Sequence, residues 1–138
     1  ILKEKNVTVL TVEEEEDLNP RFLMDIKKTY KPEKVMVEFN GTWSVTKFLE
    51  NGFPGGWELA QTITTVDAST FESYMNNMRQ MMMEQIGSTE LVIFNRCTAE
   101  TKKNSFRKAV KTFNRRAQVV YEALDGEDGI EDEIEFLE

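Results

Sequence analysis

The segment Glu38-Phe39-Asn40-Gly41 combines residue types that can bind the metal and phosphates of a nucleotide. A carboxylate such as Glu38, placed at the end of a buried strand, can hold Mg²⁺ directly or through a water. A glycine such as Gly41 lets the backbone approach a terminal phosphate and lets the segment after it move. The alternative is a strand-end glutamate before an ordinary turn. The segment supplies two candidate catalytic residues, and Glu38 is also the candidate Mg²⁺ ligand.

A second candidate site is Asn95-Arg96-Cys97-Thr98, which follows a short apolar run. An asparagine amide at this place can hydrogen-bond a purine base, and the stem of Arg96 can stack on the face of the base. Cys97 could act as a nucleophile only if a base activated it, and the chain contains no histidine. Arg96 alone would activate the thiol only modestly. We therefore expect an inert cysteine beside a base-binding asparagine.

Two further patterns are better explained by structure than by chemistry. Asp67 closes a β-branched run, and we expect it to cap the next helix or to pair with the positive end of that helix. A stripe of large apolar side chains follows at helical spacing: Phe71, Met75, Met78 and Met82. Thioethers can bind soft metals such as Cu(I), but flexible methionines at this spacing are typical of core packing. Exposure of part of the stripe as a partner surface is the second choice.

The segment 102–116 is strongly basic and is expected to form a helix. A basic helix can follow the phosphates of a nucleic acid. However, no aromatic residues interleave on its basic face, and an acidic tail follows it. A solvated helix face, which could pair with that tail, is therefore favoured. Its basic residues are Lys102, Lys103, Arg107, Lys108, Lys111, Arg115 and Arg116.

The composition narrows the classes of function. A chain of 138 residues, 40% of them hydrophobic, is long enough for one compact domain with a core. The absence of histidine excludes Ser-His-Asp catalysis and histidine metal ligands. The single cysteine, Cys97, excludes an internal disulfide and fits a reducing cytoplasm. No apolar stretch approaches the roughly 20 residues that span a bilayer, so we expect no membrane partner.

The net charge of −8 comes from the carboxy-terminal end of the chain. Residues 125–138 contain eight of the 25 acidic residues and no Lys or Arg, so the other 17 acids balance the 17 basic residues of the chain. A block of this kind is typical of a solvated, poorly ordered tail. A regulatory or partner-binding role for the tail is the alternative.

The local sequence predicts alternating strands and helices. Asn19 before Pro20 marks the start of one helix, and Ser69-Thr70-Phe71-Glu72 fits a capping box at the start of another. Glycines and a proline make residues 51–56 a loop. The expected strands cover residues 6–12, 34–39, 59–66, 91–94 and 117–123, and the expected helices cover residues 20–30, 44–50, 69–86 and 101–115.

Most of these strands are apolar runs, which is typical of parallel strands buried between helices. We therefore predict an α/β fold in three layers, with a mostly parallel sheet flanked by helices. Ligands of such sheets bind beyond the carboxyl ends of the strands. Glu38, Asp67 and Asn95 all lie at predicted strand ends, so we expect them near one edge of the sheet.

The ordered motifs resemble the CobW branch of the metal-handling P-loop GTPases. The likeness covers residues 34–122. It implies a P-loop NTPase-like fold, with residues 1–124 a partial GTPase domain and residues 125–138 the acidic tail. The motifs that carry the resemblance are Glu38-x-x-Gly41, Thr65-Val66-Asp67-Ala68 with Phe71 close behind, Glu84-Gln85-Ile86, Asn95 after a strand, and Asn114-x-x-Ala117 before the last strand.

The resemblance also implies roles for individual residues. Glu38 would serve Mg²⁺, Gly41 would lie at the switch near the γ-phosphate, and Asn95 would meet the guanine. The family's guanine motif is Asn-Lys-x-Asp, whereas this chain has Arg96 in place of the lysine and Thr98 in place of the aspartate. The family's Cys-x-Cys-Cys metal motif is replaced by the acidic residues 13–17.

The family's phosphate-binding loop, Gly-x(4)-Gly-Lys-Ser/Thr, does not occur in this sequence. We expect that about 40 to 50 residues of strand, loop and helix precede Ile1. GTP and Mg²⁺ are expected as cofactors only together with that loop, and the 138 residues alone are expected neither to bind GTP tightly nor to hydrolyse it.

The leading expectation is a cytoplasmic, GTP-binding switch in metal homeostasis or metal-cofactor assembly, which acts on a client metalloprotein or another protein partner. The alternative is a degenerate pseudo-GTPase that acts as a protein-interaction module. A homodimer is expected if the sheet edge is otherwise unpaired, and nucleic-acid binding through residues 102–116 ranks last.

Overall fold

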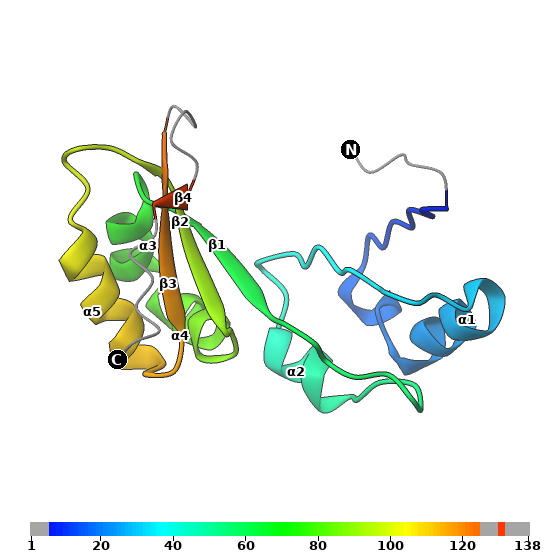
Figure 1. Ribbon diagram of the computed structural model, residues 1–138. Coiled ribbons are helices and arrows are strands. Elements are labelled where there is room, and N and C mark those ends of the chain that lie inside the picture. Colours follow the sequence, from blue (N-terminus) through cyan, green and yellow to red (C-terminus); the bar gives the residue numbers. More distant parts are fainter. Residues whose placement is uncertain (1–5, 125–129, 132–138) are drawn as a thin grey trace. The chain divides into compact units, whose positions relative to one another are not determined.

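The computed structural model describes residues 6–124 and 130–131, and the chain divides into two compact units, residues 1–58 and residues 59–138. The described part of the first unit contains a short 3-10 helix, η1 (Glu15–Asp17), and two α-helices, α1 (Pro20–Tyr30) and α2 (Val45–Glu50) (Figure 1). The prediction of a single domain over residues 1–124 stays a prediction.

Both α-helices of the first unit begin where the sequence predicts. The side-chain oxygen of Asn19 accepts a hydrogen bond from the amide of Phe22 at 2.9 Å, with Pro20 at the first helical position. The hydroxyl of Ser44 accepts from the amide of Lys47 at 3.2 Å. These contacts satisfy amide groups that have no partner within the first helical turn. The helix α1 ends at Lys31, which adopts a left-handed conformation with φ 44°.

Two predicted strands are absent from the first unit. Residues 6–12 and residues 34–39 form no ladder with any described strand. Most of their apolar side chains are exposed instead of buried; Val9 is 67% exposed and Met36 is 78% exposed. A β-branched run becomes a strand only when a neighbouring strand supplies hydrogen-bond partners. Both expectations were therefore wrong in the described structure.

The second unit carries the sheet. Its elements are β1 (Ile63–Asp67), α3 (Phe71–Asn77), α4 (Arg79–Gly87), β2 (Leu91–Cys97), α5 (Lys103–Phe113), β3 (Gln118–Ala123) and β4 (Ile130–Glu131). The strand order is β1-β2-β3-β4, in which the first three strands are parallel and β4 is antiparallel to β3. The predicted strands at residues 59–66, 91–94 and 117–123 are thereby confirmed, with shifted ends. The fold of this unit is α/β.

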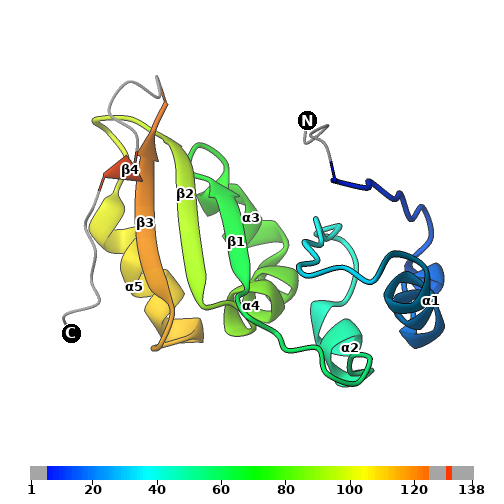
Figure 2. The same ribbon diagram turned by 45° about the vertical axis from the view of Figure 1, so that its right-hand side comes forward.

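All three helices of the second unit lie on one face of its sheet (Figure 1 and Figure 2). In-register side chains on that face, such as Val92 with Val119 and Phe94 with Tyr121, are almost fully buried. Leu91 and Ile93 alternate with them and are only half-buried, as expected for the opposite face. The described residues of this unit by themselves therefore form two layers, whereas the sequence predicts three.

An aromatic cluster forms the centre of this core. Phe94 is fully buried, and its ring centroid lies 4.9 Å from that of Phe71, 5.2 Å from that of Phe106 and 5.8 Å from that of Tyr121. Burial of one such side chain stabilises a fold by about 1.5 to 3 kcal/mol. The cluster therefore joins β2, β3, α3 and α5 into one packed body.

The single helix predicted over residues 69–86 is interrupted. It forms α3 and α4, which meet at Met78, where φ is −132° and ψ is 40°. Asn76 and Asn77 precede the break, and asparagine is a poor helix former because its side chain competes for backbone groups. The Asn77 amide does so here, since it donates to the Ser73 carbonyl at 3.0 Å.

The break changes the predicted methionine stripe. Phe71 and Met82 are buried, and Met75 packs against the core, as predicted. Met78 is 43% exposed, so its expected place in the core was wrong. The stripe is therefore core packing at three positions and surface at the fourth.

The predicted capping box is also absent. The residue before α3 is Thr70, and its side chain makes no cap hydrogen bond. The Ser69 hydroxyl donates to the Asp67 carboxylate instead, at 2.6 Å. The Glu72 carboxylate lies 3.7 Å from the ammonium of Lys102. The aspartate therefore holds the serine that the sequence pattern assigned to the helix.

The basic helix is confirmed as α5, with Phe106 and Val110 buried on its inner face. Part of its charge has a structural use, since the Lys111 ammonium donates to the Ala117 carbonyl at 2.6 Å. In the acidic tail, Ile130 pairs with Glu122 and Glu131 with Tyr121 to form β4. The expectation of a poorly ordered tail is wrong for these two residues, and for residues 125–129 and 132–138 it lies outside the described residues.

Candidate functional site

The candidate site of the second unit lies at the carboxyl ends of β1 and β2. Asp67, the last residue of β1, is the in-register partner of Asn95 in β2. The backbone continues the contact, because the Ala68 amide donates to the Asn95 carbonyl at 3.0 Å. Two residues that the sequence places at separate strand ends are thus direct neighbours in the fold.

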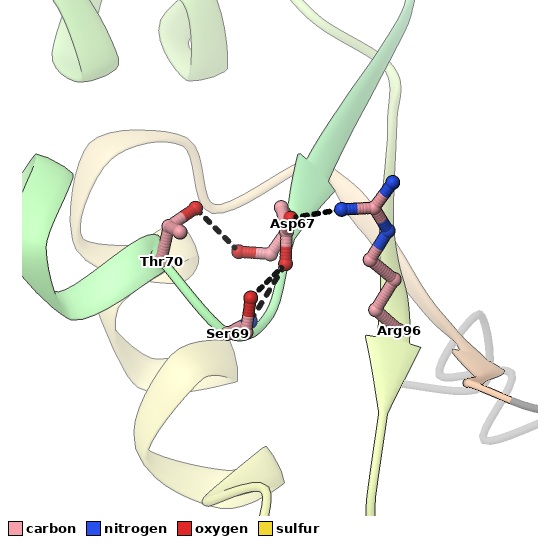
Figure 3. Close-up of polar contacts among 4 residues, drawn as sticks. All are labelled: Asp67, Ser69, Thr70 and Arg96. Atoms are coloured by element: carbon pink, nitrogen blue, oxygen red, sulfur yellow. Dashed lines mark hydrogen bonds and ion pairs between the residues drawn. The ribbon is translucent and has the colours of Figure 1, made fainter.

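Asp67 organises the turn that leads from β1 into α3 (Figure 3). One of its carboxylate oxygens accepts from the Ser69 hydroxyl at 2.6 Å and from the Ser69 amide at 2.9 Å. The other accepts from the Arg96 guanidinium at 3.0 Å. The hydrogen bonds from Ser69, and then the charge of Arg96, hold the pKa of the Asp67 carboxyl below its usual value, while burial opposes them. The group is therefore a fixed anion at neutral pH, which agrees with the structural role expected for it.

Arg96 lies at an irregularity of β2. The register between β2 and β3 shifts between Phe94 and Cys97, and Arg96 adopts a left-handed conformation with φ 56°. This conformation costs an L-residue roughly 1 to 2 kcal/mol. The bulge re-aims the side chain, which reaches Asp67 on the neighbouring strand and remains 64% exposed. Strained residues of this kind cluster at binding sites.

Asn95 presents an unsatisfied group. Its side-chain oxygen Oδ1 is buried and has no hydrogen-bond partner among the described residues. A buried acceptor without a partner costs about 1 to 3 kcal/mol. Such a group in a folded protein calls for an explanation, and a ligand that donates a hydrogen bond would supply one.

Thr98 begins the turn into α5. Its amide donates to the Thr101 hydroxyl at 2.8 Å, and its carbonyl accepts from the Thr101 amide at 3.1 Å. The Glu100 carboxylate lies 3.5 Å from the Thr98 hydroxyl. A carboxylate is therefore close to the position where the resemblance expects one, although it does not belong to residue 98.

Cys97 is buried, and its thiol donates to the Phe94 carbonyl at 3.3 Å. A covered thiol is not accessible to a substrate, which agrees with the expectation of an inert cysteine. Among residues 6–124 and 130–131, no group of three or more Cys, Asp and Glu side chains is arranged to hold a metal ion.

Glu38 and Gly41 belong to the first unit. Glu38 is exposed and follows no strand, so the strand-end placement predicted for it was wrong. Beside it, Asn40 forms a turn in which its side-chain oxygen accepts from the Thr42 amide at 2.9 Å. The roles expected for Glu38 toward Mg²⁺ and for Gly41 near a phosphate stay predictions.

The structural roles of two residues, Ser69 and Asn114, were not predicted from the sequence. Ser69 was assigned to a helix cap, although the Asp67-x-Ser69 spacing is also that of an Asx turn and could have revealed the contact. Asn114 was quoted only as part of a resemblance. Its amide donates to the Ile86 carbonyl at 3.1 Å and to the Thr89 carbonyl at 2.8 Å, so it ties the end of α5 to the end of α4 and to the loop that follows α4.

Comparison with known proteins identifies no family for this chain. No protein-family model matches the chain, and no curated protein or solved structure is significantly similar to it. None of the helices in the described part of the chain is long and apolar enough to cross a bilayer.

Proposed function

We propose that the chain is part of a CobW-like, GTP-binding protein of the cytoplasm, whose nucleotide state governs metal delivery or metal-cofactor assembly on a client protein. The observation that carries the proposal is Asn95, a strand-end asparagine with a buried, unpaired side-chain oxygen beside Asp67. Ligands of parallel sheets bind at this edge. In the proposal, Asn95 meets the base and the stem of Arg96 lies against it.

The order of the sheet is compatible with a P-loop NTPase-like fold. No described strand pairs with the outer edge of β1. In a P-loop domain the strand that leads into the phosphate loop is central, and the edge of β1 offers it a place. Without that loop, nothing in the described residues would hold the β- and γ-phosphates or complete a Mg²⁺ site, so the 138 residues alone bind GTP at most weakly.

Asn95 and Thr98, the residues proposed to lie near the base, are suited to a purine in general and not to guanine in particular. Asn95 can bond a ring edge, but the aspartate of the family's motif is replaced by Thr98. Asp67 is already held by Ser69 and Arg96, which leaves Glu100 as the carboxylate nearest to Thr98. Guanine recognition in this protein would therefore use Glu100 or would be relaxed.

A nucleotide titration tests the proposal. Two proteins are compared: the 138-residue chain, and the chain joined at Ile1 to the residues that its reading frame encodes upstream. Fluorescent GDP and ATP analogues are titrated with and without Mg²⁺. We expect saturable, Mg²⁺-dependent binding in the longer protein and a loss of at least tenfold in affinity when Asn95 is replaced by Ala. If the longer protein contains a phosphate loop and still binds no nucleotide, the proposal of a nucleotide-dependent switch is refuted.

A second function, a pseudo-GTPase that acts as a protein-interaction module, has its own support. Tyr74, Met78 and Met83 on α3 and α4 are each more than 40% exposed, and methionine-rich surfaces accommodate varied partners. This function predicts that the longer protein binds no nucleotide and that Met78→Glu abolishes binding of the protein partner.

A further inference from the structure

A pocket of about 200 Å³ lies within the first unit, and neither Glu38 nor Gly41 is among the residues that line it. It is bounded by η1, the start of α1, the segment that contains Phe39 and Trp43, and α2. Nothing in the proposed GTPase uses it. Its volume suits one large side chain or a small organic molecule.

One wall of this pocket is aromatic. The ring centroid of Phe39 lies 6.0 Å from that of Trp43, edge to face, and 5.4 Å from that of Phe48. Phe48 in turn contacts Phe53 at 5.8 Å, which supports the wall from behind the lining residues. All of these rings are partly exposed instead of fully buried. Aromatic faces of this kind attract cations through their negative potential.

Two acidic side chains also line the pocket and form its carboxylate rim. Glu15 and Glu16 both line the pocket and belong to a run of five acidic residues, 13–17. Glu15 is fixed in place, because its Oε2 atom accepts a hydrogen bond from the Ser44 amide at 3.0 Å. One cation, Lys47, also lines the pocket; it is exposed, as is Glu16, so water and salt screen both charges, whereas Glu15 is half-buried.

We propose that this pocket binds an arginine side chain presented by a basic segment of a partner protein. The guanidinium group is planar, stacks on aromatic faces and pairs with carboxylates through two parallel hydrogen bonds. The aromatic wall and the carboxylate rim match these two properties. An ammonium group stacks less well, and an apolar side chain would make no use of the two carboxylates.

The test uses the full 138-residue chain and a matched pair of small probes. N-acetyl-arginine amide is titrated against its neutral analogue, N-acetyl-citrulline amide, and binding is followed by ¹H–¹⁵N NMR at the Trp43 indole and the Ser44 and Lys47 amides. We expect saturable shifts with the arginine probe in the millimolar range. The citrulline probe should bind at least fivefold more weakly, because its ureido group has a similar shape but lacks the positive charge and two of the N–H donors.

Three variants separate a specific pocket from general attraction. Glu16→Gln removes a rim charge and should weaken the arginine probe about three- to tenfold. Glu15→Gln should act alike while keeping an oxygen for the Ser44 amide, and its NMR spectrum reports whether the unit remains folded. Glu13→Gln lies in the same acidic run but does not line the pocket, so it should change affinity less than twofold.

Three outcomes would overturn the proposal. The first is equal binding of the arginine and citrulline probes. The second is equal weakening by Glu13→Gln and Glu16→Gln, which would show unspecific attraction. The third is the absence of a saturable shift at the Trp43 indole up to about 50 mM probe. None of them bears on nucleotide binding by the other unit, so the two proposals stand or fall separately.

Discussion

The guanidinium of Arg96 lies 3.0 Å from the carboxylate of Asp67 and joins the bulge of β2 to the end of β1. The same carboxylate holds both donors of Ser69, so one anion fixes the β1–α3 turn and orients the arginine. Any ligand that stacks on the Arg96 stem would meet a side chain whose direction is already set. Preorganisation of this kind lowers the entropy lost on binding.

The Asp67 contacts should make stability depend on pH. A carboxyl whose pKa is lowered by folding stabilises the fold above its ordinary pKa of 3.8, and this contribution disappears as the pH falls through the lowered value. The free energy of unfolding of the native chain should therefore exceed that of Asp67→Asn at pH 6. The difference should shrink as the pH falls below about 4.

Urea unfolding followed by circular dichroism between pH 3 and pH 7 measures this difference. Ser69→Ala should reproduce part of the effect, because it removes the hydroxyl hydrogen bond, the largest cause of the lowered pKa, and keeps the hydrogen bond from the amide. If the difference in the free energy of unfolding between the native chain and Asp67→Asn stayed constant from pH 3 to pH 7, the charge of the carboxylate would not be involved.

Phe94→Ala should destabilise the second unit strongly. Phe94 is fully buried among Phe71, Phe106 and Tyr121, so its removal leaves a cavity in the centre of the core. The expected loss is about 3 to 5 kcal/mol in the free energy of unfolding. Met83→Ala is the control, since Met83 is 45% exposed and should change stability by less than about 0.5 kcal/mol. Similar urea midpoints for both variants would contradict the core described above.

Asn114→Ala should cost about 1 to 3 kcal/mol, because it leaves the carbonyl groups of Ile86 and Thr89 without their side-chain donor. Thermal unfolding gives the value. Asn104→Ala is a matched control on the exposed side of α5, where alanine favours the helix and stability should stay equal or rise slightly. If the two variants unfolded alike, Asn114 would have no structural role.

Thr98→Asp should increase the preference for GTP over ATP if the proposed function is right. The substitution restores the carboxylate that the family's motif supplies for guanine, and a charged hydrogen-bond acceptor contributes roughly tenfold or more in affinity. Competition between the two nucleotides in the longer protein measures the ratio. Thr98→Asn, which has the same shape but no charge, should leave it unchanged, and a rise with asparagine alone would argue against a charge effect.

The helices α1, α2 and α5 were predictable because their signals are local. Asn19 with Pro20, and Ser44 before α2, act within one helical turn, and the amphipathic pattern around Phe106 and Val110 defines α5. The apolar runs at residues 6–12 and 34–39 look equally regular. They are not strands, since pairing depends on a neighbour that the local sequence does not specify.

The candidate site was predictable only in part. The parallel pattern placed Asp67 and Asn95 at strand ends, and the register confirms that they are neighbours. The Arg96–Asp67 contact could not be foreseen, because it depends on a bulge and on a left-handed backbone at a residue that rarely adopts one. The unsatisfied oxygen of Asn95 likewise could not be predicted, because its burial depends on the positions of the side chains around it.

The strand order of the second unit has a consequence for synthesis. Each strand pairs with the one that follows it along the chain, so β1 meets β2, β2 meets β3 and β3 meets β4. A strand that leaves the ribosome therefore finds its neighbour already made, and none has to be inserted between two others. Each parallel pairing spans a crossover that contains a helix, so it can form only after that whole crossover has been made. The sheet can thus grow at a single edge while the protein is still being translated, with β1 as its template.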